Sequence, residues 1–180
     1  MLNNNSGKEY FGEEFIKEFE SILQECKENE SFLFMHGTPS KDDADEICSS
    51  GLKTDFPELY YTAELISHED VLLYDKLKSW PHWDCKFLIM CCVPENSGKG
   101  GMPIWSESPD GFFVLSPEFI WGYIDVIQKR IVENKLYSQT HNFETLIQDR
   151  SYLPITAERL GISIPPDEEE FYNEIFEEEK

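Results

Sequence analysis

Three short segments of this chain place polar or aromatic side chains at the edge of an apolar run. The first covers residues 32–38 and ends in His-Gly-Thr, the second covers residues 58–63 and contains two adjacent tyrosines, and the third covers residues 111–120 and follows two carboxylates. An imidazole can hydrogen-bond a ligand, an aromatic ring can stack on one, and a carboxylate can stabilise a developing positive charge. Because each segment is short and degenerate, their order along the chain is more informative than any one of them.

In this order the segments resemble the ADP-ribosyltransferase fold, on the side shared by diphtheria-type toxins and the poly(ADP-ribose) polymerases. Two further segments fit the same pattern: a helix ending in Gly51-Leu52, and the apolar run over residues 87–93, which falls where that family has a central core strand. The resemblance covers roughly residues 31–127. It implies an α+β fold of two small antiparallel sheets flanked by helices, with a cleft that holds NAD folded in on itself.

The resemblance also implies roles for individual residues. His36 would hydrogen-bond the adenine-side ribose, and the backbone of Gly37, within the matching sequence His36-Gly37-Thr38, would hold the nicotinamide carboxamide. Tyr60 would stack on the nicotinamide ring, with Tyr61 as the alternative one residue along. Because successive strand residues point to opposite faces, only one of these tyrosines can point into the cleft.

The chain departs from the family pattern at the catalytic position. The family has a Glu at the start of the last motif strand, and the position that corresponds, counted back from Pro117, holds Gly111. The nearest carboxylates are Asp110 and Glu107, and either is a candidate to support the oxocarbenium-like state of NAD cleavage. If neither serves, the protein binds NAD or ADP-ribose without the usual catalysis, or uses neither.

Two other patterns resemble a phosphate-binding loop and a zinc site but lack the required residues or spacing. Gly98-Lys-Gly-Gly101 lacks the Ser or Thr and the following helix of a phosphate-binding loop, so it indicates an ordinary loop. His82 and Cys85, with Cys91 and Cys92, lack the paired two-residue gaps of structural zinc sites, so no metal is expected. The last two cysteines are adjacent on an expected strand and should face opposite ways.

Composition indicates which kinds of partner the protein can bind and in which compartment it is expected. The 180 residues fit one domain, and the formal net charge of −21 argues against nucleic-acid and anionic-membrane binding and favours a basic protein partner. No stretch approaches the roughly 18 apolar residues of a membrane span, and the N-terminus has no signal-peptide core, so a cytoplasmic protein is expected. The odd number of cysteines without framework spacing favours reduced, buried thiols.

Periodicity and turn signals predict the elements. The expected helices cover residues 9–28, 63–79 and 129–150, and a further helix begins after an N-cap at Ser40 and ends at Gly51. The expected strands cover residues 32–36, 58–62, 86–93 and 111–116. For residues 117–127 the resemblance favours a turn and a strand, whereas periodicity leaves a helix open. Residues 128–180 are expected to form a helical, acidic C-terminal extension of the core.

These observations lead to one main expectation and two alternatives. The main one is a cytoplasmic, NAD-dependent ADP-ribosyltransferase, a glycosyltransferase that moves ADP-ribose from NAD to an acceptor, most simply a protein. The first alternative is a catalytically inactive module on the same fold. The second is an acidic interaction or inhibitor protein that covers a basic surface of a partner.

Overall fold

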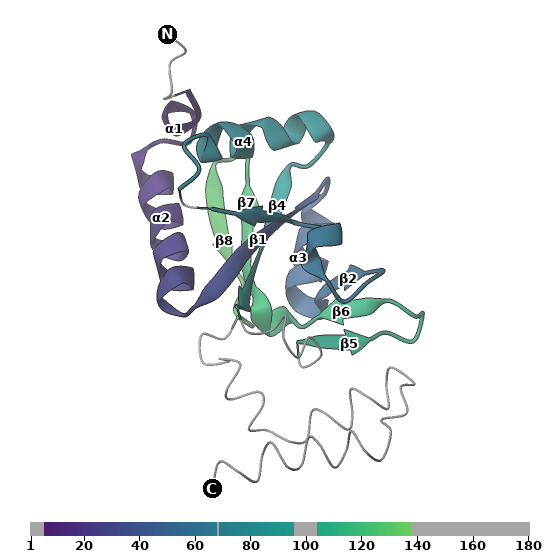
Figure 1. Cartoon of the computed structure of the whole chain (residues 1–180). Helices are drawn as coiled ribbons and strands as arrows, with labels where there is room; N and C mark the ends of the chain where they lie inside the picture. The colour runs from purple at the N-terminus through teal and green to yellow at the C-terminus, as the bar shows by residue number, and fades with distance from the viewer. Residues whose placement is uncertain (1–5, 68, 96–103, 138–180) are drawn as a thin grey trace, which may run out of the picture.

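Two antiparallel sheets lie on either side of a shared core, with helices around them (Figure 1). The computed structural model describes residues 6–67, 69–95 and 104–137. Its α+β class and its pair of small antiparallel sheets confirm the coarse expectation from the sequence. The expected C-terminal extension lies outside the described residues from position 138 onward, and so does the expected loop at Gly98-Lys-Gly-Gly101.

The larger sheet has five strands in the order β3-β1-β4-β7-β8. Its strands are β1 (Ser31–Thr38), β3 (Glu64–Ile66), β4 (Phe87–Pro94), β7 (Ile120–Asp125) and β8 (Arg130–Glu133). The smaller sheet has the order β2-β6-β5, with β2 (Leu52–Thr54), β5 (Trp105–Glu107) and β6 (Phe113–Leu115). Strands β1 and β4 pair over eight residues each, from Ser31 opposite Pro94 to Thr38 opposite Phe87, so they form the centre of the larger sheet.

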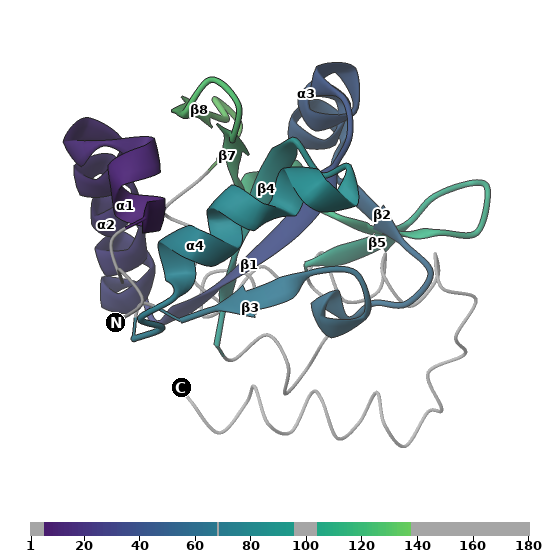
Figure 2. The same ribbon diagram turned by 90° about the horizontal axis from the view of Figure 1, so that it is seen from above.

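Three helices cover one face of the larger sheet (Figure 2). These are α1 (Ser6–Phe11), α2 (Glu13–Glu28) and α4 (Leu73–Ser79). The side chains of the apolar stripe expected over residues 9–28 are all buried, namely Phe11, Phe15, Phe19, Ile22 and Leu23. The expected single helix is divided at Gly12, whose φ of 84° ends α1 before α2 begins. The stripe packs on Leu33, Met35, Leu88 and Met90 of the sheet.

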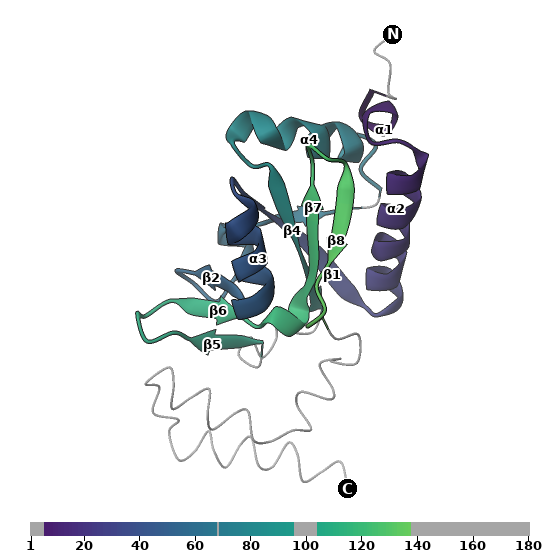
Figure 3. The same cartoon turned by 180° about the vertical axis from the view of Figure 1, so that it is seen from behind.

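The other face of the larger sheet carries α3 (Lys41–Ser50) and the smaller sheet (Figure 3). Both ends of α3 lie where the sequence predicts them. At its start, the Ser40 hydroxyl accepts a hydrogen bond from the backbone N–H of Asp43 at 3.0 Å. Gly51 ends the helix with a φ of 97°, and a side chain there would collide with the carbonyl of Leu115. The glycine is therefore required for the close approach of α3 and β6.

Three expected elements take a different form in the structure. The expected strand over residues 58–62 is a 3-10 turn, η1 (Leu59–Tyr61), because the N–H groups of Thr62 and Ala63 bond back to the carbonyl of Leu59. The expected helix over residues 63–79 begins with strand β3, which pairs with the edge of β1. Residues 130–133, expected to be helical, form β8 because they pair with β7. In each case a neighbouring strand or a local turn overrides propensity.

Two other expectations, for the end of α4 and for residues 117–127, are confirmed. Helix α4 ends at Ser79, before a 3-10 turn, η2 (Trp80–Trp83), that contains Pro81. The segment after Ser116 is a 3-10 turn, η3 (Pro117–Phe119), followed by β7, so the turn-then-strand alternative holds. Among the described residues, no helix combines the length and the apolar character that crossing a bilayer requires.

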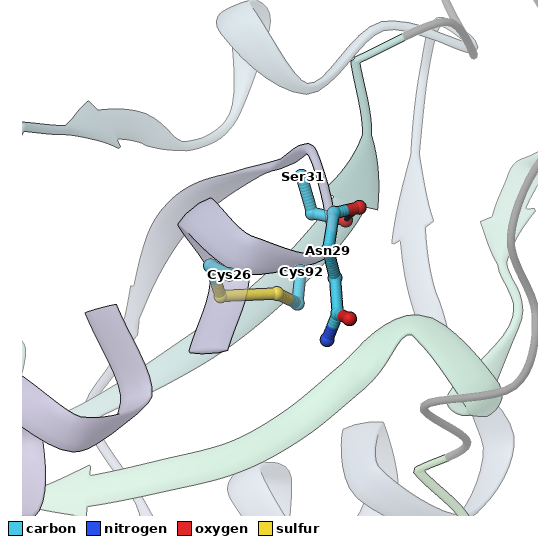
Figure 4. Close-up of a disulfide and its surroundings, with 4 residues drawn as sticks. All are labelled: Cys26, Asn29, Ser31 and Cys92. Carbon is cyan, nitrogen blue, oxygen red and sulfur yellow. Dashed lines mark hydrogen bonds between the residues drawn. A yellow bond between two sulfur atoms is a disulfide. The ribbon is translucent and has the colours of Figure 1, made fainter. Parts of the chain in front are cut away.

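Cys26 and Cys92 form a disulfide between α2 and β4 (Figure 4). The expectation that all five cysteines are reduced is therefore wrong for this pair. Cys92 faces α2, whereas Cys91 is buried on the opposite face, as the alternation of a strand predicts. Beside the bridge, the turn from Asn29 to Ser31 leads from α2 into β1, and the hydroxyl of Ser31 donates to the carbonyl of Asn29 at 3.2 Å.

Reduction of the Cys26–Cys92 disulfide is expected to lower the free energy of unfolding by about 4 kcal/mol, because the bridge closes a loop with a sequence separation of 66. Chemical denaturation with and without reductant measures the change. The double variant Cys26→Ala/Cys92→Ala should lose this sensitivity to reductant. Thiol titration of the denatured, unreduced protein should find the three free cysteines Cys48, Cys85 and Cys91. A count of five would contradict the bridge.

Candidate functional site

His36 lies on β1 and is held by the segment that follows the two tyrosines. Its Nδ1 is 2.7 Å from the backbone carbonyl oxygen of Thr62 and 3.2 Å from the Thr62 hydroxyl. Because a carbonyl only accepts hydrogen bonds, the short contact requires the proton on Nδ1. In the neutral ring Nε2 is then an acceptor, suited to a hydroxyl donor such as a sugar. The structure thus brings together the first two segments singled out in the sequence.

Thr62 also lines a cleft of about 400 Å³, and His36 is not part of the lining of that cleft. Aromatic side chains of Phe56, Tyr61 and Phe112 line it, together with the polar side chains of Lys53 and Asp55. A second hollow, of about 460 Å³, runs along residues 60–65 beside Met35 and Trp80. Tyr61 and Thr62 line both spaces, so the residues around His36 sit at the junction of two surface depressions.

The two tyrosines point to different neighbours. Tyr60 packs edge-on against Phe34, with 5.0 Å between ring centroids, and Tyr61 packs against Phe56 at 5.3 Å. Both are largely exposed, at 61% and 73%. They belong to a 3-10 turn rather than a strand, so strict alternation does not decide which one faces the cleft. The lining of the cleft includes Tyr61 but not Tyr60.

Gly37 and Thr38 serve the packing of β1 on its two faces. A side chain at Gly37 would meet Cys85 Sγ at 2.5 Å and Trp80 at 2.9 Å, on the face opposite to His36. Thr38 is buried, and its hydroxyl donates to the Asp43 carboxylate at 3.3 Å. Strand β3 pairs only with residues 33–35 of β1, so beyond Met35 that edge of β1 has no strand partner in the described part of the chain.

Glu107 lies on the face of the smaller sheet that turns toward the larger one. It is in register with Phe113, and Phe113 is in register with Thr54, so the three side chains share a face. Trp105, two residues before Glu107, is buried on that face in the core shared with Phe34 of β1. Thr54 lines the cleft. Two strand spacings place Glu107 about 10 Å from Thr54 across the sheet.

Asp110 is at the exposed tip of the β5–β6 hairpin and has partners of its own. Its carboxylate accepts a hydrogen bond from the Ser108 hydroxyl and forms an ion pair with Lys53 at 3.3 Å. The Ser108 bond and, to a smaller extent, Lys53 lower the pKa of Asp110 below its ordinary value. The carboxylate therefore stays ionised but is already engaged outside the core.

Gly111 occupies the position where the family pattern has a Glu, and its backbone explains the difference. Its φ is 86°, in the left-handed region that favours glycine, and its N–H donates to the Ser108 carbonyl at 2.9 Å. A glutamate would be strained in this turn.

Five residues that line the cleft were not expected from the sequence: Lys53, Thr54, Asp55, Phe56 and Phe112. The sequence signal for the first four is their place directly after Gly51-Leu52, which the resemblance already marks. Phe112 was counted only as part of an apolar strand. Within residues 6–67, 69–95 and 104–137, no group of three or more His, Cys, Asp or Glu side chains could hold a metal ion.

Comparisons with protein-family models, with curated proteins and with solved structures found no match for the chain.

The replacement Gly37→Ala is expected to destabilise the fold by about 1–3 kcal/mol, because the added methyl group collides with Cys85 and Trp80. Urea denaturation measures the loss. In the double variant Gly37→Ala/Cys85→Gly the loss should be smaller than the sum of the two single effects. Additive losses would contradict the packing role of Gly37.

The side-chain carboxyl of Asp110 is expected to titrate below the ordinary aspartate value of 3.8, because its ionised form accepts the Ser108 bond and pairs with Lys53. Carbon-detected NMR titration of the carboxyl measures the midpoint. Ser108→Ala should raise the midpoint more than Lys53→Met does, since the Ser108 bond has the larger effect. The reverse order would show that the ion pair dominates.

Proposed function

We propose that this protein is an NAD-dependent ADP-ribosyltransferase-like protein that binds NAD at the cleft beside His36. The observation that carries the proposal is the hydrogen bond from His36 to the carbonyl of Thr62. It joins His36-Gly37-Thr38 to the segment with Tyr60 and Tyr61, in the order and the two-sheet setting that the resemblance implies.

The chemistry of the cleft lining supports a nucleotide ligand. Tyr61, which lines the cleft next to Phe56, is placed to stack on the nicotinamide ring. Tyr60, the first choice from the sequence, packs on Phe34 instead. His36 is not part of the cleft lining, but its Nδ1 bonds the cleft residue Thr62, and its Nε2 would accept a ribose hydroxyl of a ligand that extends past Thr62. The unpaired edge of β1 beyond Met35 offers backbone groups to a carboxamide.

Glu107 is the stronger candidate for the catalytic carboxylate. Within the described residues its side chain makes no hydrogen bond or ion pair, and it shares a face with Thr54 of the cleft, whereas Asp110 is engaged by Ser108 and Lys53. In the reaction the bond between the ribose and nicotinamide breaks and nicotinamide leaves with the electron pair. The acceptor then bonds to the ribose carbon, and its proton passes to Glu107 or to water. The acceptor is most simply a protein side chain.

A second candidate function is NAD or ADP-ribose binding without turnover. The turn at Gly111 favours it, since a φ of 86° leaves no place for the usual glutamate. The two candidates share the binding site and differ only in whether Glu107 acts on the ligand.

Binding of NAD by calorimetry, followed by mass spectrometry for released nicotinamide, tests the proposal. His36→Ala should weaken NAD binding about tenfold, because it removes the ribose acceptor. Glu107→Gln should bind NAD as the wild type does but release nicotinamide about 100-fold more slowly. Asp110→Asn is the matched control, since it removes one charge three residues away and should leave the rate near that of the wild type.

Each outcome separates the candidates. Binding without nicotinamide release in the wild type would favour the inactive module. Equal losses for Glu107→Gln and Asp110→Asn would remove the specific role of Glu107. No binding at millimolar NAD would reject the proposed function altogether.

A further inference from the structure

A groove separate from the NAD cleft lies between the start of β1 and the smaller sheet. It has a volume of about 340 Å³ and is lined in part by residues 57–60, whereas residues 61 and 62 line the cleft. Its floor is apolar and buried, formed by Phe34, Val93, Ile104 and Trp105. Such a floor holds its shape because both sheets pack around it.

Two exposed aromatic rings form the walls of the groove. Phe32 is 37% exposed and Tyr60 is 61% exposed, and both lie edge-on to Phe34 with ring centroids 6.4 and 5.0 Å away. Flat aromatic faces next to solvent are suited to stacking by a planar cation. Arginine fits this requirement better than lysine, because the guanidinium is planar and weakly hydrated.

The rim of the groove is acidic. Glu58 and Glu95 both line it and are exposed, and within the described residues neither side chain makes a hydrogen bond or an ion pair. The backbone N–H of Glu95 bonds to the carbonyl of Glu30 at 2.9 Å, which fixes the backbone of Glu95 at the rim. No Lys or Arg belongs to the described lining of the groove. The groove thus presents aromatic surface and uncompensated negative charge, in a chain whose formal net charge is −21.

We propose that this groove is a docking site for a basic segment of a partner protein, with an arginine side chain between Phe32 and Tyr60 and its charge against Glu58 and Glu95. Charge complementarity selects this occupant, because an apolar or acidic segment would leave both carboxylates uncompensated. The site does not require NAD, and its residues other than Tyr60 lie outside the cleft and the hollow next to it.

The probe is a capped glycine–arginine–glycine tripeptide, titrated into the full-length, isotope-labelled protein and followed by NMR. The counterpart is the same peptide with citrulline, which keeps the shape of arginine and removes its charge. The arginine peptide should shift the assigned indole N–H of Trp105 with a Kd of about 1 mM, and the citrulline peptide should bind about tenfold more weakly. Raising the salt concentration should weaken binding of the arginine peptide only.

The variant Glu58→Gln/Glu95→Gln should weaken binding of the arginine peptide about tenfold and leave binding of the citrulline peptide unchanged. Its matched control is Glu18→Gln/Glu46→Gln, which removes the same net charge from exposed positions on α2 and α3. The control should bind both peptides as the wild type does. A control that weakens binding equally would show that overall charge, and not the groove, attracts the peptide, and would overturn the proposal.

Two further results would overturn the proposal. Equal binding of the arginine and citrulline peptides would show that the groove does not recognise the positive charge of arginine. Nuclear Overhauser contacts between the groove and residues 138–180 of the same chain, without peptide, would show that the chain fills its own groove. Because NAD is absent throughout, these results do not depend on whether the protein is a transferase.

Discussion

The pairing of β1 with β4 is the constraint on which the rest of the structure depends. The two strands are in register over eight residues each and carry core side chains on both faces. Leu33 and Met35 of β1 face the helical layer, whereas Phe34 and His36 face the smaller sheet. A slip of one residue would exchange these two sets. The register therefore sets both the core and the side of the sheet on which His36 meets the segment after the tyrosines.

The disulfide and the cap of α3 hold the two layers onto this central pair. Cys92 of β4 is bonded to Cys26 of α2, so the aromatic stripe of that helix is tied to the sheet it covers. On the other face, the absence of a side chain at Gly51 allows α3 to reach β6. The smaller sheet is thereby held opposite β1, and its edges shape both the cleft beside Thr62 and the groove beside Tyr60.

Much of the fold was predictable where local chemistry and periodicity agree. The stripe of α2, the cap at Ser40, the end of α4 before Pro81 and the buried strand over residues 87–94 follow from side-chain spacing and backbone preference. Strands β3 and β8 could not be predicted from their own residues. Each is short and pairs along one side with a longer strand, so distant hydrogen bonds determine its conformation.

For the site, the sequence by itself identified the candidate residues: His36, the adjacent tyrosines and the carboxylates around Gly111. These follow from residue type, order and resemblance. The tertiary structure alone decided their surroundings. It bonds His36 to Thr62, and it sets Tyr60 and Tyr61 in a turn against different aromatic rings. It also pairs Asp110 with Lys53 and turns Glu107 toward the shared core. The physical reason is that each of these contacts joins residues far apart in the chain or depends on a backbone turn, and sequence spacing encodes neither.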